Sequence, residues 1–137
     1  MLFHPLIVHV TLVLLTVGVA TDVLYLFTGK EKFGRWGKNL LLAGTGGAVL
    51  AVLTGFQAYD RVVIPAEVEP LVQAHRLSGQ IAMWGFLALT ALRWGLEWRK
   101  RLLPSLRWVY LLVGAAALIF LLRTGLMGGQ MAYIYGV

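Results

Sequence analysis

The chain has 137 residues and a formal net charge of +6; 59% of its residues are hydrophobic, 13% are charged and none is cysteine. Soluble domains contain about 45–50% apolar and about 25% charged residues, so this composition favours an integral membrane protein. The lack of cysteine excludes disulfides, thiolate metal sites, c-type haem attachment and iron–sulfur ligation. The positive charge does not predict nucleic-acid binding, because the basic residues gather in two loops between apolar runs.

Four apolar runs are each long enough to cross the hydrocarbon layer as a helix, which takes about 20 residues. They cover roughly residues 5–27, 39–59, 75–96 and 106–127. Because they take up nearly the whole chain, we expect one all-α domain over residues 1–137, an integral membrane four-helix bundle without a soluble catalytic module. The first run has neither a basic segment before it nor a cleavage site after it, so we expect a retained helix and not a signal peptide.

The distribution of basic residues predicts the orientation in the membrane. Eight of the twelve Lys and Arg residues lie in the loops after the first and third runs, which include 29–38 and 97–107. Such loops remain in the cytoplasm, so both termini and the 60–74 loop are predicted to face outward. We therefore expect a multi-pass protein of the bacterial cytoplasmic (inner) membrane, N-out and C-out, with the lipid bilayer around it.

Two parts of the chain resemble each other. Thr54-Gly55 near the end of the second run corresponds to Thr124-Gly125 near the end of the fourth, and each is followed by a Gln-x-Ala-Tyr-like segment. This internal repeat predicts two helical hairpins of parallel topology, related by an axis along the membrane normal. Asp22 in the first run and Arg93 in the third take matching positions, so we expect them to form a neutralising pair within the membrane.

The three histidines lie near the predicted outer surface. His4 and His9 open the first run, and His75 opens the third. An ionisable side chain at a membrane helix indicates a functional site by default. The repeat brings one imidazole from each hairpin to opposite sides of the central axis. Counting from the Thr-Gly pairs matches His4 with His75, whereas counting from the prolines matches His9 with His75.

Two opposed imidazoles predict a b-type haem, which requires two axial ligands, a slot lined by small side chains and cations for the propionates. We expect His9 and His75 to be the axial ligands, with His4 at the rim. The residues predicted to complete the site are Gly46, Gly47, Gly79 and Gly125 for the slot, and Arg76 or Arg123 for the propionates.

Two alternatives stay open. One is a zinc or copper site made by His4, His9 and His75, with Asp60, because imidazole suits both metals. Five positions separate His4 from His9, about 140° around a helix, so they share a face only if the N-terminus unwinds. The other is a cofactor-free accessory subunit in which the histidines cap helix ends.

The sequence contains no serine nucleophile beside a base, no phosphate loop and no carboxylate pair within a helix. We therefore favour an electron carrier, or a subunit of a larger redox complex, over a stand-alone enzyme. Electron transfer is expected at the outer, periplasmic face. The glycine-rich faces predict close association in the membrane, either as a homodimer or with subunits of a cytochrome or respiratory redox complex.

The opening His4-Pro5-Leu6-Ile7-Val8-His9 resembles that of small bacterial membrane proteins grouped as domain of unknown function 2231, whose first helix begins His-Pro-x-x-Val-His. Thr54-Gly55, His75 and the closing 128–133 segment also match, so the resemblance covers nearly the whole chain. The family name implies no activity, but the association of its members with respiratory and cytochrome-like modules implies a redox role. Val10-Thr11 departs from the usual Phe-Pro, which predicts a straighter first helix here.

Overall fold

The computed structural model describes residues 3–98 and 106–136, and in this part of the chain it has four helices and no strand. The helices are α1 (Phe3–Thr28), α2 (Glu31–Tyr59), α3 (Glu69–Trp98) and α4 (Arg107–Tyr133). The all-helical, four-helix prediction is therefore confirmed. Each helix has between 26 and 30 residues, and at 1.5 Å per residue each exceeds the roughly 30 Å hydrocarbon core.

Three of the helices, α1, α2 and α4, are long and apolar enough to cross a membrane. α3 is as long, but polar side chains such as Gln80 and Arg93 interrupt its apolar run. The prediction of four membrane-spanning runs is thus supported for three of them. Apolar side chains also cover the outside of the bundle: Leu112 is 71% exposed and Leu126 is 73% exposed. Such a surface is suited to lipid, because large apolar faces are rare on soluble monomers.

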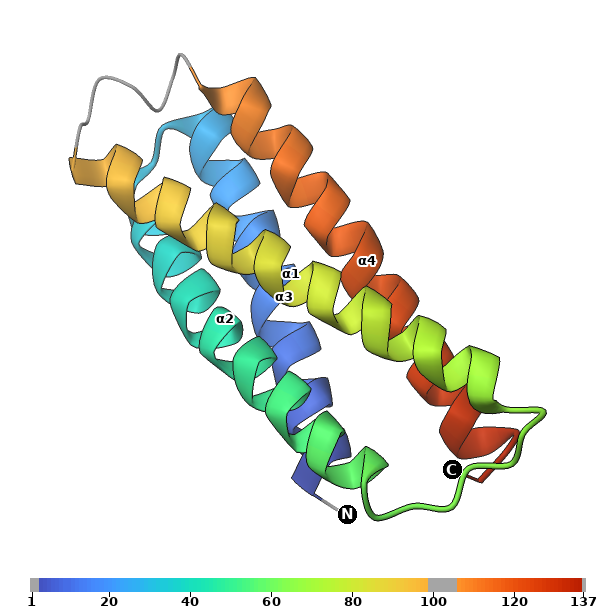
Figure 1. Cartoon of the computed structure of the whole chain (residues 1–137). Helices are drawn as coiled ribbons and strands as arrows, with labels where there is room; N and C mark the ends of the chain where they lie inside the picture. Colours follow the sequence, from blue (N-terminus) through green and yellow to red (C-terminus); the bar gives the residue numbers. More distant parts are fainter. Residues whose placement is uncertain (1–2, 99–105, 137) are drawn as a thin grey trace.

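The helices pack as two antiparallel hairpins, α1 with α2 and α3 with α4, and α2 also packs against α3 (Figure 1). Both termini lie at the same end of the bundle, together with the connection between α2 and α3. Small residues allow α1 and α2 to approach closely, since a Cβ at Gly44 would lie 2.7 Å from Leu15 Cγ. Leu15, Leu41 and Phe86 are fully buried at the centre of the bundle.

The turn between α1 and α2 is shorter than the sequence indicated. The 29–38 segment was expected to be a loop, but α2 begins at Glu31. Gly29 and Lys30 make the turn; Gly29 has a φ of +69°, and its N–H donates to the carbonyl of Tyr25 at 2.9 Å. Glycine takes this left-handed conformation without a steric penalty. Three of the four basic residues of this segment, Lys32, Arg35 and Lys38, therefore lie on a helix. The basic residues at 99–101, between α3 and α4, fall outside the described residues.

Candidate functional site

A cleft lies between the two hairpins, at the end of the bundle that holds both termini. Its volume is about 210 Å³, more than ten times the space that one water needs. All four helices line it, mostly with aliphatic side chains and glycine. The polar side chains among its lining residues are His4, Thr11, Tyr59, His75, Arg76 and Thr124. An apolar cleft with a few convergent polar groups is the usual form of a ligand site.

His4, near the start of α1, is held by Thr54 of α2. Its Nδ1 lies 2.9 Å from Thr54 Oγ1. The Thr54 hydroxyl also reaches the carbonyls of Leu50, at 2.8 Å, and Ala51, at 3.1 Å. When it donates to either carbonyl, His4 Nδ1 donates to Thr54 and the imidazole keeps a free lone pair on Nε2. Gly55 makes room for the ring, because a Cβ there would lie 3.2 Å from His4 Cε1.

His75, near the start of α3, is held in a matching way by α4. Its Nδ1 lies 3.0 Å from the carbonyl oxygen of Thr124. A carbonyl only accepts hydrogen bonds, so Nδ1 carries the proton here too, and Nε2 keeps its lone pair. A Cβ at Gly128 would lie 3.2 Å from His75 Cε1. Each hairpin thus holds one imidazole at the threonine of its own Thr-Gly pair, through the side-chain hydroxyl of Thr54 and through the backbone carbonyl of Thr124.

His9 lies elsewhere. It is exposed on α1, its Nδ1 is 2.6 Å from the carbonyl of Pro5, and it does not line the cleft. The structure therefore brings His4, and not His9, into the cleft with His75. The reason is the angle of about 140° between positions five apart on a helix. Within residues 3–98 and 106–136, no group of three or more His, Cys, Asp and Glu side chains is arranged to hold a metal, so the three-histidine arrangement does not form there.

Of the other residues predicted for the site, some line the cleft and some lie outside it. Gly79, Gly125 and Arg76 line the cleft. Gly47 does not; it packs against the hydroxyl of Thr11, which a Cβ at that position would strike. Arg123 is exposed on α4 and also lies outside the cleft lining.

Thr11 was not anticipated as a site residue. It is 3% exposed, it lines the inner end of the cleft, and its hydroxyl has no hydrogen-bond partner among the described residues. A spacing of seven residues places it on the same face of α1 as His4, and that spacing is the signal the sequence offered. The partners of the two histidines, Thr54 and Thr124, were noted in the sequence only as a repeat.

Arg76 lies at the mouth of the cleft, on the turn of α3 that also carries His75. Its guanidinium stacks over the ring of Tyr59, with Cζ 4.1 Å from the ring centroid, and over that of Phe56 at 5.0 Å. Its Nε is buried and has no hydrogen-bond partner in the described part of the chain. Such stacking stabilises a cation by its attraction to the ring quadrupole.

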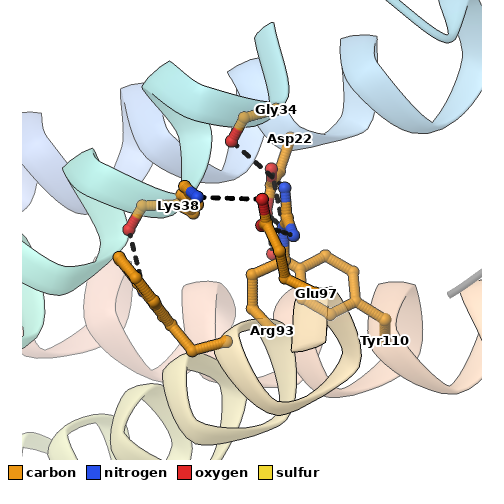
Figure 2. A network of polar contacts seen from close by, with 7 residues as sticks. Asp22, Gly34, Lys38, Arg93, Glu97 and Tyr110 are labelled. Carbon is orange, nitrogen blue, oxygen red and sulfur yellow. Dashed lines mark hydrogen bonds and ion pairs between the residues drawn. The ribbon is translucent and has the colours of Figure 1, made fainter. Parts of the chain in front are cut away.

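The opposite end of the bundle holds a buried polar network, with Asp22 and Arg93 at its centre (Figure 2). Arg93 Nε lies 2.9 Å from Asp22 Oδ2, and Tyr110 also donates a hydrogen bond to this carboxylate. Asp22 is 0% exposed and Arg93 is 2% exposed. The predicted pair is therefore confirmed. Its charges compensate each other, as buried ions require.

The same arginine extends the network to the remaining helix. Arg93 Nη1 lies 2.8 Å from Glu97 Oε2, and Nη2 donates to the carbonyl of Gly34 at 3.1 Å. Glu97 in turn accepts from Lys38 Nζ, at 2.8 Å. Asp22 belongs to α1, Gly34 and Lys38 to α2, Arg93 and Glu97 to α3, and Tyr110 to α4. All four helices are thus joined at this end, which supports a structural role for the network.

Four long helices with an apolar exterior and a paired charge in the interior define a helical membrane protein. The model of the family described as "Predicted membrane protein (DUF2231)" matches residues 2–137, and the chain belongs to this family. The resemblance noted in the sequence is confirmed. No curated protein and no solved structure matched the chain.

Proposed function

We propose that this protein is a membrane electron carrier that binds haem b in the cleft, where Nε2 of His4 and Nε2 of His75 would hold the iron. One observation carries the proposal: His4 and His75 line the same cleft, and each uses its Nδ1 for a contact with the protein, to Thr54 Oγ1 and to the carbonyl of Thr124, which leaves Nε2 to bind a metal. Metal-ligating histidines almost always donate their other ring N–H to a protein acceptor, which fixes the tautomer and the ring orientation. His9 also donates from Nδ1, to the carbonyl of Pro5, but it lies outside the cleft; the pair is therefore distinguished by the position of both imidazoles in one cleft and not by the tautomer alone.

The residues present suit a flat, largely apolar macrocycle. Aliphatic side chains, with Gly79 and Gly125, form most of the lining, and the two imidazoles come from different hairpins. Bound haem supplies a one-electron iron couple. The protein contributes the two nitrogen ligands, their orientation through the threonines and an apolar lining that excludes water. No substrate bond is made or broken, which agrees with a carrier or a subunit more than with a stand-alone enzyme.

The orientation and partners belong to the same proposal. The basic residues near the network end support its placement in the cytoplasm, so the cleft and both termini face outward from a bacterial inner membrane. The matching His–Thr contacts of the two hairpins support the parallel-topology repeat. A carrier of this size requires a donor and an acceptor, and subunits of a respiratory or cytochrome complex, or a second copy of the chain, are the partners we propose.

The test is an absorption spectrum of the detergent-purified protein, oxidised and then reduced with dithionite, with metal analysis of the same sample. We expect a Soret band, a sharp reduced α-band and stoichiometric iron. His4→Ala and His75→Ala are expected to lose the haem, whereas the control His9→Ala retains it. A colourless, metal-free protein from haem-replete cells would leave the accessory-subunit alternative standing. Zinc or copper in a colourless sample would favour a histidine metal site.

A further inference from the structure

Arg76 is the charged group of the cleft, and among the described side chains it has no acidic partner within ion-pair distance, although Glu69 lies within electrostatic range. The acid nearest to it on the same helix, Glu69, is already engaged at the mouth. Tyr59 donates to Glu69 Oε1 at 3.0 Å, and Gln73 Nε2 donates to the same oxygen at 2.6 Å. These contacts also fix the ring of Tyr59 beneath the guanidinium. Among the described residues, no acidic side chain forms an ion pair with Arg76.

The way in which Arg76 is held determines what it can bind. Stacking on Tyr59 and Phe56 occupies the face of the guanidinium, while its N–H donors lie in the plane of the group. That edge matches the two oxygens of a carboxylate and can bind them in a bidentate manner. Three buried side-chain nitrogen or oxygen atoms lack a partner in the described part of the chain, and two of them, Arg76 Nε and Thr11 Oγ1, line this one cleft.

We infer that Arg76 is the anion subsite of the cleft and that it binds a carboxylate of the cofactor at the cleft mouth. The inference rests on the proposed haem function and deepens it, because it names the residue that would hold a carboxylate of the bound haem. It also decides between the two arginines that the sequence offered. Arg123 is exposed on α4 outside the cleft, which makes it the matched control: its loss removes the same charge without touching the site.

The experiment compares haem with its dimethyl ester, which has the same ring and iron but no free carboxylate. Both are titrated into the detergent-purified, haem-depleted full chain and into the variants Arg76→Gln, Arg76→Lys and Arg123→Gln. We expect Arg76→Gln to weaken haem binding by about tenfold to a hundredfold, the range for a charge-assisted hydrogen bond, and to leave ester binding unchanged. The haem affinity of Arg76→Lys is expected to lie between those of the parent chain and Arg76→Gln. The haem affinity of Arg123→Gln is expected to equal that of the parent chain.

The outcomes separate the two proposals. A parent chain that binds neither compound overturns the haem function, and the subsite with it. A parent chain that binds both equally well, with no effect of Arg76→Gln, leaves the haem function standing and overturns the subsite. An anion at Arg76 could also be the phosphate of a lipid headgroup. Loss of copurified anionic phospholipid from Arg76→Gln with unchanged haem affinity would assign the subsite to lipid and overturn the cofactor assignment.

Discussion

Arg93 Nε lies 2.9 Å from Asp22 Oδ2, and this contact joins two helices whose residues are 71 positions apart in the chain. Both side chains are almost completely buried. The other nitrogens of Arg93 are used by Glu97 and by the carbonyl of Gly34. The guanidinium therefore has a partner on every side, and the carboxylate is completed by Tyr110. This saturation is what allows an ion pair to persist in an apolar interior.

Removal of one partner of this pair is expected to cost far more than removal of both. Arg93→Met leaves the Asp22 carboxylate buried without a cation, and we expect a loss of about 3–5 kcal/mol in the free energy of unfolding. The double variant Asp22→Leu/Arg93→Met is expected to recover most of that loss. The measurement is unfolding in mixed detergent–SDS micelles, followed by circular dichroism. Losses that simply add in the double variant would contradict the pairing.

Substitution by alanine is expected to have opposite effects on stability at two glycines of α2, Gly37 and Gly46. A Cβ at Gly37 would lie 2.8 Å from Asp22 Cγ and 3.0 Å from its backbone nitrogen, whereas Gly46 has nothing within 4 Å. Gly37→Ala is expected to destabilise the protein by about 1–3 kcal/mol, because the network holds Asp22 in place. Gly46→Ala is expected to stabilise the helix by up to about 1 kcal/mol. Equal unfolding midpoints for the two variants would refute the close approach at Gly37.

Two buried threonines predict effects of opposite sign when their hydroxyls are removed. Thr11 is 3% exposed and its hydroxyl has no partner in the described chain, while Thr45 is 4% exposed and bonds Thr90 Oγ1 at 2.7 Å. In cofactor-free protein, Thr11→Val is expected to raise the unfolding free energy by about 1 kcal/mol, and Thr45→Val to lower it by about 1–3 kcal/mol. A clear loss on Thr11→Val would show that this hydroxyl does have a hydrogen-bond partner in the folded protein.

The hydrogen bond from His4 to Thr54 predicts an effect on ligand affinity. Thr54→Val removes the acceptor that fixes the His4 tautomer, and such losses typically lower metal affinity by about 10–100-fold. Thr28→Val is the matched control, since Thr28 makes the same bond to the carbonyl four residues earlier, at 2.6 Å, but at the other end of the bundle. Haem titration of the two variants measures the difference. Equal affinities would remove His4 from the ligand set.

The outward orientation of the cleft is tested by labelling. The chain has no cysteine, so single-cysteine variants carry no background. Val63, between α2 and α3, is 94% exposed, and Glu31, at the start of α2, is exposed at the opposite end of the bundle. In intact spheroplasts, an impermeant maleimide is expected to label Val63→Cys, and to label Glu31→Cys only after permeabilisation. The reverse pattern would invert the topology.

Features set by composition and pattern were accessible from the sequence, whereas features set by helix rotation were not. Run length and hydropathy predicted four helices, and matching positions predicted the pair of Asp22 and Arg93. The choice between His4 and His9 depended on which face of α1 meets α2, and several glycine contacts decide that face. The start of α2 was misplaced because charged residues suggested a loop, although lysine and glutamate favour helices as well.

The separation of Asp22 from its partner affects how the protein is made. α1 is synthesised before α3, and its aspartate precedes Arg93 by 71 residues, which corresponds to several seconds of translation at about 5–20 residues per second. During that interval the first hairpin exists without the cation that neutralises Asp22, and an unpaired carboxylate within the membrane is unfavourable. The arrival of α3 ends this cost, so insertion of the second half of the chain and assembly of the bundle are one coupled event of biogenesis.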